Sequence, residues 1–501
     1  MADASYETIT RLIENSEKGL AQIEVILPTV LETRQVVLDS VKKHEDTGVV
    51  IDLLLIVLDI LLAENEVMYD LSASLDALLR SRNDYTKRYY MQSLNLCFWE
   101  ACQVFVGEYG DDDCGLLTKL EKVTKQMNQA GCQSICTHII DDIQDFRKNY
   151  CDKELRNITR HYDDPIKMYE KQHALNDIDF FAKGASQLMA IRMEISVLST
   201  YLLNHLHPLK REHQSFTRNS RFDIKPMVNG ILFKAFQRKA LKDDVQRILD
   251  QGQASLDNCF QVYNKCQTAE KFLIENNYHV SGEFDKIKSM VRLRMEMLFL
   301  RYDVACSVWG YLNAVSDKER SQNLRLIHIT KQAALTHIYG YNDIVRGKSL
   351  WAKIKEMEEA DSEKLATNSV EKLLKELTDN LRQDNEYSRM FAHYRYKQNF
   401  YIPARLEAFN NMEHNKELIA AEKLLKVCKV LDVYTSDLLL YIDEKQKHEQ
   451  KKRYDRWMVM IDGLEVKSGN NDKVKKMMKP LRELIDKIYN KSDHDNWASR
   501  K

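Results

Sequence analysis

The chain has 501 residues, of which 44% are hydrophobic and 30% charged, a balance typical of globular rather than disordered proteins. Its formal net charge is -1, so no global positive field attracts nucleic acid, and contact with RNA would need a local basic patch. Only 15 glycines and 6 prolines interrupt it, too few for many hairpins or glycine-rich phosphate loops. We therefore expect an all-α protein.

The N-terminus lacks the basic, apolar and small-residue order of a signal peptide. Ten cysteines are spread through the chain, many of them beside apolar residues, which fits free buried thiols in a reducing compartment better than disulfides. The most apolar run, Val49 to Ala63, carries Asp52 and Asp59 and is too short to span a bilayer, so we expect a buried helix there. We predict a cytoplasmic protein without membrane contact.

Apolar residues at intervals of three and four predict one or two amphipathic helices over 4–43, followed by a turn that ends at Gly48. Long stretches of the same periodicity follow, and the predicted helices are 50–79, 85–109, 115–129, 132–149 and 171–206. Between the last two lies Leu155 to Pro165, which begins another helix or lies within its first turns. Residues 208–226 are polar and basic and are expected to form a connection.

The same order then starts again, with helices over 240–275 and 284–314, a turn ending at Gly282 and a charged break at 317–320. Corresponding landmarks keep nearly constant offsets: Gly282 lies 234 positions after Gly48, Arg325 lies 237 after Arg88, and His393 lies 232 after His161. We predict two tandem multi-helix bundle units produced by an internal duplication. The alternative is that long amphipathic helices resemble one another without common origin.

This order gives five predicted segments. They are an N-terminal helical segment (1–48), a first helical domain (49–207), a linker with connecting helices (208–283), a second helical domain (284–453) and a basic C-terminal helical tail (454–501). Within the tail, a helix is expected from Lys473 to Tyr489.

One stretch carries residue types that suggest chemistry. Arg156 precedes His161 with four residues between them, and Asn157 directly follows the arginine. This pattern resembles the signature of the HEPN superfamily, which consists of all-α domains with an Arg, four to six intervening residues and a His. Asp163 and Asp164 fill the place where the abortive-infection branch often has polar or acidic residues. The resemblance covers roughly residues 50–205, and a second copy, roughly 284–445, matches only in arrangement.

The resemblance implies RNA cleavage without a metal or other cofactor, in phage defence or a toxin–antitoxin setting, with RNA as substrate and an antitoxin or other protein as partner. His161 would take the proton of the 2′-hydroxyl, because its pKa lies near neutrality. Arg156 would bind two phosphate oxygens through its planar guanidinium group, and Asn157 would orient Arg156 or the phosphate. Family sites are usually built from two motifs across a dimer. A homodimer, or an intramolecular pseudo-dimer that adds His393 from the second copy, would supply both.

The second copy departs from the signature. Ser388 stands where Arg156 would match, and Arg389 is separated from His393 by only three residues, which rotates it by about 100° around a helix axis. The second site is therefore expected to be degenerate, which leaves a composite site in doubt. The alternative function is a non-catalytic helical scaffold for RNA binding or protein interaction. In it the motif is inert, and Arg156 pairs with Glu154 or Asp152 on the surface.

Three other clusters have two interpretations each. Cys132, Cys136 and His138 are metal-competent, but no fourth ligand is near and the cysteine spacing is wide for zinc, so no metal is expected. The basic and aromatic side chains over 85–90 would suit single-stranded RNA but fit a helix packing face better. The basic run 445–453 would be a solvated helix end or a local phosphate patch. The chain contains no Walker-type loop, Gly-x-Gly-x-x-Gly, His-Glu-x-x-His or Gly-x-Ser-x-Gly.

Overall fold

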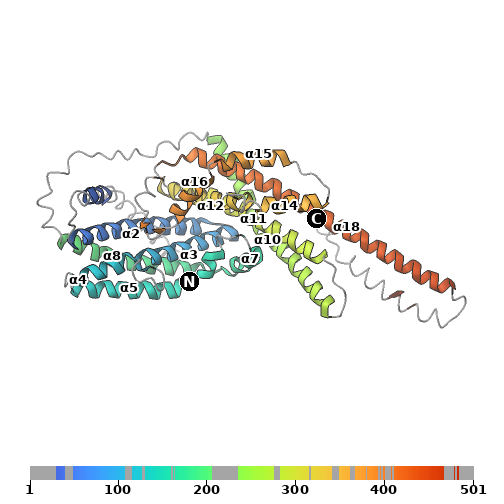
Figure 1. Ribbon diagram of the computed structural model, residues 1–501, viewed down its shortest axis with the longest axis horizontal. Helices are drawn as coiled ribbons and strands as arrows, with labels where there is room; N and C mark the ends of the chain where they lie inside the picture. Colours follow the sequence, from blue (N-terminus) through green and yellow to red (C-terminus); the bar gives the residue numbers. More distant parts are fainter. Residues whose placement is uncertain are drawn as a thin grey trace. The chain divides into compact units, whose positions relative to one another are not determined.

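A computed structural model describes residues 30–39, 49–107, 115–126, 130–158, 162, 164–205, 235–275, 283–314, 317–340, 349–361, 367–379, 381–392, 395–396, 399–400, 408, 411–467, 479 and 482–483. These residues are overwhelmingly helical, so the predicted all-α fold is confirmed (Figure 1). None of the helices in these ranges is both long and apolar enough to cross a membrane.

The elements follow one another as long helices joined by shorter ones. They are α2 (Val49–Arg80), α3 (Asp84–Val106), α4 (Leu116–Gln126), α5 (Ala130–Tyr150), α6 (Lys153–Ile158), α7 (Pro165–Ala174), α8 (Ile178–His205), α10 (Ala235–Glu275), α11 (Glu283–Asn313), α12 (Asp317–Ile338), α14 (Leu350–Asp361), α15 (Thr367–Thr378), α16 (Leu381–Ala392), β1 (Arg395–Tyr396), β2 (Asn399–Phe400) and α18 (His414–Lys467). The two strands pair antiparallel, with Arg395 opposite Phe400.

The predicted helix over 171–206 is wrong at its start, because it consists of two helices. Pro165 opens α7, where its fixed φ and missing N–H suit the first helical position, and Asp164 accepts a hydrogen bond from the Lys167 amide at 3.3 Å. A second cap separates α7 from α8, since the Asp177 side chain accepts from the Phe180 amide at 2.9 Å. The proline therefore begins α7.

Two further boundaries differ from the prediction. The charged stretch 317–320, expected to be a break, is the first turn of α12, which begins at Asp317. The basic run 445–453 lies in the middle of α18, which continues to Lys467, so it is not a helix end. The duplication and the five-segment division remain predictions. Several predicted segments lie outside the described residues: residues 4–29 of the helices expected over 4–43, the 208–226 connection, the turns at 44–48 and 276–282, and most of the 473–489 helix.

The chain divides into two compact units. The larger comprises the described residues within 1–262 and 295–431, and the smaller those within 263–294 and 432–501. In the smaller unit, Arg292 donates to the Tyr263 hydroxyl at 3.0 Å, and Lys288 lies 2.6 Å from Glu270. In the larger unit, α2 packs on α3, α4, α8 and α12, which places it at the centre of the core (Figure 1).

Helix α2 buries carboxylates as well as leucines. Glu64 lies 2.6 Å from Arg192 on α8, and Asp70 forms an ion pair with Arg325 on α12. Burial raises the pKa of Glu64 to about 7, although Arg192 opposes the shift. Burial and the neighbouring Asp70 carboxylate raise the pKa of Glu66 to about 8. The carboxylates of α2 thus form ion pairs with α8 and α12, two of the helices that pack on it.

Helix α3 meets α11 and α12 through its aromatic side chains. Tyr85 is buried and donates to Asp303 at 2.7 Å, and Tyr90 is buried and donates to the Cys306 carbonyl at 3.1 Å. Tyr89 lies 3.1 Å from the Thr330 hydroxyl. This confirms the interpretation of residues 85–90 as a packing face.

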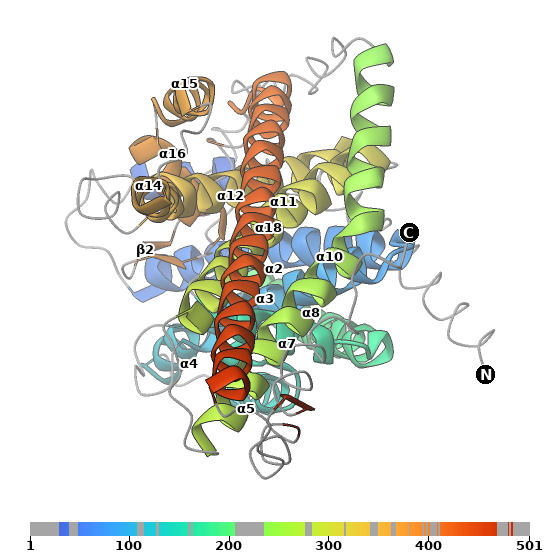
Figure 2. The ribbon, with the colours of Figure 1, turned by 90° about the vertical axis from the view of Figure 1, so that its right-hand side faces the viewer.

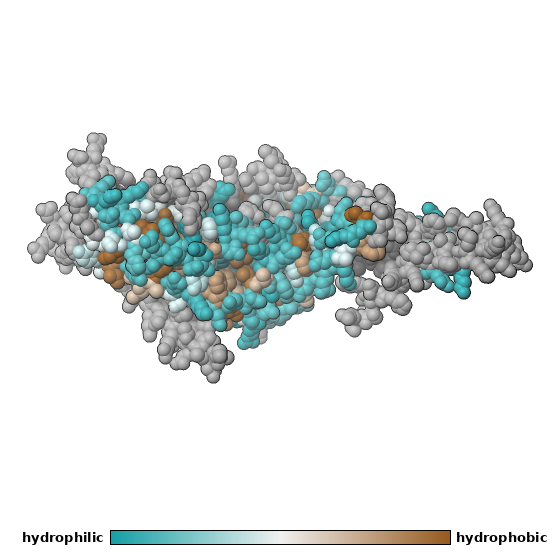
Figure 3. Space-filling view, turned by 90° about the horizontal axis from the view of Figure 1, so that it is seen from below, coloured by the Kyte–Doolittle hydropathy of each residue, from teal (hydrophilic) through white to brown (hydrophobic). Residues whose placement is uncertain are grey.

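Helix α12 carries a group of short helices, α14, α15 and α16, which pack on it (Figure 2). The Gln332 side chain fixes the start of α16 by donating to the Leu381 carbonyl at 2.8 Å. The described surface seen in Figure 3 is mainly hydrophilic, with separate hydrophobic patches.

Candidate functional site

Arg156 and Asn157 lie on α6, a helix of 6 residues that is held against α3. Asp152 caps it, since its side chain accepts from the Leu155 amide at 2.9 Å. Asn95 on α3 binds the backbone of Asp152 on both sides, donating to its carbonyl at 2.9 Å and accepting from its amide at 2.8 Å. The start of α6 is therefore fixed by two bonds to one buried side chain of α3.

The Arg156 guanidinium lies between solvent and the core, with 21% of its side chain exposed. Its Nη2 is 3.3 Å from a carboxylate oxygen of Glu100, which is almost fully buried, and the guanidinium lies over the Trp99 ring at 5.4 Å. Glu154 instead pairs with Lys167 at 2.7 Å and with Lys171, contacts that lower the pKa of its carboxyl to about 2. Sequence patterns gave no sign of Glu100, because it lies 56 positions from Arg156.

Asn157 is exposed, whereas His161 and His393 both lie outside the described residues. The residue directly after His161 is described: Tyr162 is buried and donates to Asp303 on α11 at 2.8 Å. The chain on the C-terminal side of the motif is thus tied to the second half of the sequence.

Asp303 joins three elements at one buried point. Its two carboxylate oxygens accept separately, one from Tyr85 on α3 and the other from Tyr162. Burial raises the pKa of Asp303 to about 7, although both tyrosine hydrogen bonds favour the ionised form. Neither tyrosine brings a positive charge that would offset the burial.

The described residues of the predicted second copy, Ser388 and Arg389, lie on α16. Ser388, which replaces the arginine, is buried, and Arg389 is exposed. Phe391 packs edge-on against His328 with ring centroids 5.4 Å apart. Ser388 and Phe391 therefore form part of a packing surface, whereas the Arg156 side chain is partly exposed.

A cavity of about 220 Å³ lies beside α6, and sequence patterns did not predict it. Its walls come from α3, the end of α5, the start of α6 and the α7–α8 connection, including Asn95, Cys151, Leu155 and Phe181. The Cys151 thiol lies 3.9 Å from that of Cys102. Arg156 and Asn157 are not among the lining residues, so this cavity is separate from the arginine of the motif.

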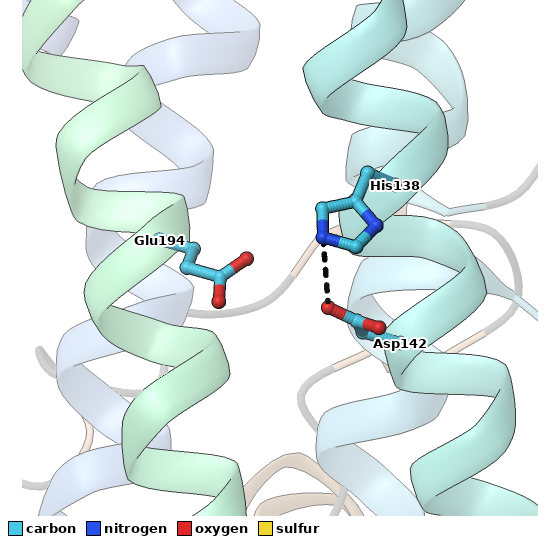
Figure 4. Close-up of side chains that lie close together, drawn as sticks. All are labelled: His138, Asp142 and Glu194. Atoms are coloured by element: carbon cyan, nitrogen blue, oxygen red, sulfur yellow. Dashed lines mark ion pairs between the residues drawn. The ribbon is translucent and has the colours of Figure 1, made fainter.

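The three residues considered for zinc do not converge. Cys132 and Cys136 are buried, whereas His138 is exposed on another face of α5. His138 instead lies near Asp142 and Glu194 (Figure 4). Every described cysteine is free of disulfide bonds, and most are buried, as expected from the sequence.

The chain matches no protein-family model, no curated protein and no solved structure.

Proposed function

We propose that the chain is a HEPN-like, metal-independent endoribonuclease whose site contains Arg156, Asn157 and His161. The support is the sequence signature together with the arrangement of its described flanks. Arg156 is oriented by Glu100 and Trp99, and its guanidinium remains partly exposed. Asn157, next to it on α6, is exposed as well.

The observation that carries the proposal is that both flanks of the motif are anchored. The start of α6 is bonded to Asn95, and Tyr162 is bonded to Asp303. Tyr162, the residue directly after His161 in the sequence, is therefore a buried anchor. Anchoring of this kind limits the movement of a catalytic group between turnovers, which is what positional catalysis needs.

In the proposed reaction, the unprotonated His161 imidazole removes the proton of the ribose 2′-hydroxyl. The 2′-oxygen forms a bond to the adjacent phosphorus, and the bond from phosphorus to the 5′-oxygen of the next nucleotide breaks. Arg156 stabilises the charge that develops on the phosphate oxygens. The leaving 5′-oxygen takes up a proton, so the products are a 2′,3′-cyclic phosphate and a 5′-hydroxyl end.

The proposal includes the internal duplication. Helices α2 and α3 have 32 and 23 residues, and α11 and α12 have 31 and 22. Asp303 on α11 lies 233 positions after Asp70 on α2, close to the offsets of the other landmarks, and each binds a side chain of the other half. A composite site would add His393, but with Ser388 in place of the second arginine only one motif is complete.

A second candidate, a non-catalytic RNA-binding or protein-interaction scaffold, is favoured by the contact between Arg156 and Glu100. A guanidinium already paired with a nearly buried carboxylate offers less net charge to a phosphate. In this candidate the pair stabilises the contact of α6 with α3, and the motif has no part in chemistry.

The test is cleavage of labelled single-stranded RNA by the purified full-length chain in the presence of EDTA. His161→Ala and Arg156→Ala are expected to lower the rate by at least about 100-fold, the size of general acid–base contributions, without changing the circular dichroism spectrum. His173→Ala, an exposed histidine on α7, is the control and should cleave like the wild type. Wild-type activity in His161→Ala, or products without a cyclic phosphate, would refute the ribonuclease and leave the scaffold.

A further inference from the structure

Three side chains with metal-binding atoms meet on the surface of the larger unit. His138 and Asp142 are four residues apart on α5, so they lie on one face of that helix. Glu194 on α8, which packs against α5, faces them across the helix contact (Figure 4). One ligand atom from each residue lies within 4.8 Å of the other two.

The donor set is one imidazole nitrogen and two carboxylate oxygens. Imidazole and carboxylate ligands suit divalent first-row transition metals such as Zn²⁺, whereas Mg²⁺ and Ca²⁺ prefer oxygen alone. In a tetrahedral site with bonds of about 2.1 Å, ligand atoms are about 3.4 Å apart. Because His138 and Glu194 are exposed, their side chains are free to rotate towards this separation while the packing of α5 on α8 holds the backbones.

The local charge favours a cation. Asp142 and Glu194 bring two carboxylates, and their surroundings in the described part of the chain include no lysine or arginine that forms an ion pair with either. The ion pair present joins Asp142 to His138, at 3.6 Å. Arg192, two positions before Glu194, is occupied on the other side of α8 by Glu64 of α2. A bound dication would balance both carboxylates at once.

We propose that His138, Asp142 and Glu194 form a binding site for a divalent transition-metal ion of the Zn²⁺ class, linking α5 to α8, with water completing the coordination. The inference is independent of the proposed ribonuclease, which needs no metal and uses other residues. Because the three ligands are brought together only when α5 and α8 are packed, the ion binds the folded chain selectively and raises its thermal stability.

The experiment is calorimetric titration of the full-length, chelator-treated chain with Zn²⁺, together with thermal unfolding at saturating Zn²⁺. A saturable site and an increase in Tm are expected for the wild type. His138→Ala and Glu194→Gln should each weaken this binding by at least about tenfold and remove the increase in Tm. The matched controls are His173→Ala and Glu170→Gln, which remove the same chemical groups from the exposed surface of α7. They should leave the Zn²⁺ affinity and the increase in Tm unchanged.

Co²⁺ serves as a second probe because thiolate ligands give it a charge-transfer absorption that nitrogen and oxygen ligands do not. The proposed site predicts a Co²⁺ spectrum without that band, lost in His138→Ala. Binding with a thiolate band that persists in His138→Ala would assign the metal to cysteines and overturn the proposal. So would the absence of saturable Zn²⁺ binding, or Mg²⁺ binding of equal affinity. His138→Ala is expected to cleave RNA at the wild-type rate whether or not the wild type binds Zn²⁺ at this site. Failure of the metal-site proposal would therefore leave the proposed ribonuclease function untouched.

Discussion

At the scale of single residues, Asp303 binds the residue that follows the motif. It is buried, and it accepts hydrogen bonds from Tyr85 on α3 and from Tyr162, the neighbour of His161. No cation is among the causes that set its pKa, which burial raises from 3.8 to about 7. Ionisation of Asp303 therefore opposes the packing of α11 against the tyrosines.

The sign of the pH dependence follows from this shift. Between pH 4 and 7 the folded chain binds a proton at Asp303 that the unfolded chain has released, so this contribution to stability falls as the pH rises through that window. The difference between 3.8 and about 7 corresponds to no more than about 4 kcal/mol. Asp303→Asn should reduce the loss of unfolding free energy between pH 5 and pH 8, measured by urea denaturation at each pH.

Glu154, whose pKa lies below the range from pH 5 to pH 8, provides the control for Asp303→Asn. Lys167 and Lys171 hold the pKa of Glu154 at about 2, so Glu154→Gln should leave the slope between pH 5 and pH 8 unchanged. Glu64 and Glu66, with raised pKa values of about 7 and about 8, contribute to the same slope, so Asp303→Asn reduces it without abolishing it. Identical slopes in the wild type and Asp303→Asn would contradict the assignment.

At the scale of elements, periodicity predicted the long helices well. The expected helix 50–79 is α2 (Val49–Arg80), and the expected 284–314 is α11 (Glu283–Asn313). The errors occur where an end depends on capping. The break between α7 and α8 contains no glycine or proline, and it is made by the Asp177 side chain. Apolar periodicity continues across such a break, so it predicts one helix where there are two.

The crossing of α3, α11 and α12 leads to a prediction about Gly310 on α11. A Cβ atom there would collide with the Tyr90 hydroxyl and the Asn323 side chain, both of which are buried. Tyr90 is held by its bond to the Cys306 carbonyl, so it cannot retreat freely. Gly310→Ala should therefore destabilise the chain by about 1–3 kcal/mol through overpacking, despite the better helix propensity of alanine.

Gly131 on α5 is the matched control, because a Cβ added there meets nothing within 4 Å. Gly131→Ala should stabilise the chain by up to about 1 kcal/mol, the difference in helix propensity. Both variants are compared by chemical denaturation. Equal stabilisation of the two would mean that α3 and α11 do not approach each other as closely as the structure places them.

At the scale of the whole molecule, the sequence predicted the helices better than the contacts between them. The Arg156–Asn157 pair was expected in the first turns of a helix, but it lies in the last turn of α6, a helix of 6 residues. The contacts of Arg156 with Glu100 and of Tyr162 with Asp303 were not predictable, because Glu100 and Asp303 lie on helices distant in sequence. For the same reason, the sequence did not predict that Glu194 lies near His138. Short motifs show residue spacing within one helix, whereas such contacts depend on how helices pack.

The last prediction concerns the attachment of α18 to α12 within the larger unit. Glu417 near the start of α18 is buried, and it lies 2.7 Å from Lys331 and 3.3 Å from His328, both on α12. Although burial opposes ionisation, His328 and Lys331 lower the pKa of Glu417 to about 2. Glu417→Gln removes the charge that compensates a buried lysine, and breaking such a pair costs about 3–5 kcal/mol.

The control is a second ion pair that joins α18 to another helix but is exposed. Glu376 on α15 lies 3.0 Å from Lys423 on α18, and Glu376→Gln should cost no more than about 1 kcal/mol. The depressed pKa adds a pH signature: stability from Glu417 is present above pH 4.5 and is lost as the pH falls towards about 2. In acid titrations followed by circular dichroism, Glu417→Gln should therefore lose less stability between pH 5 and pH 3 than the wild type. Equal costs for the two substitutions, with equal acid sensitivity, would show that α18 does not depend on the buried pair for its attachment.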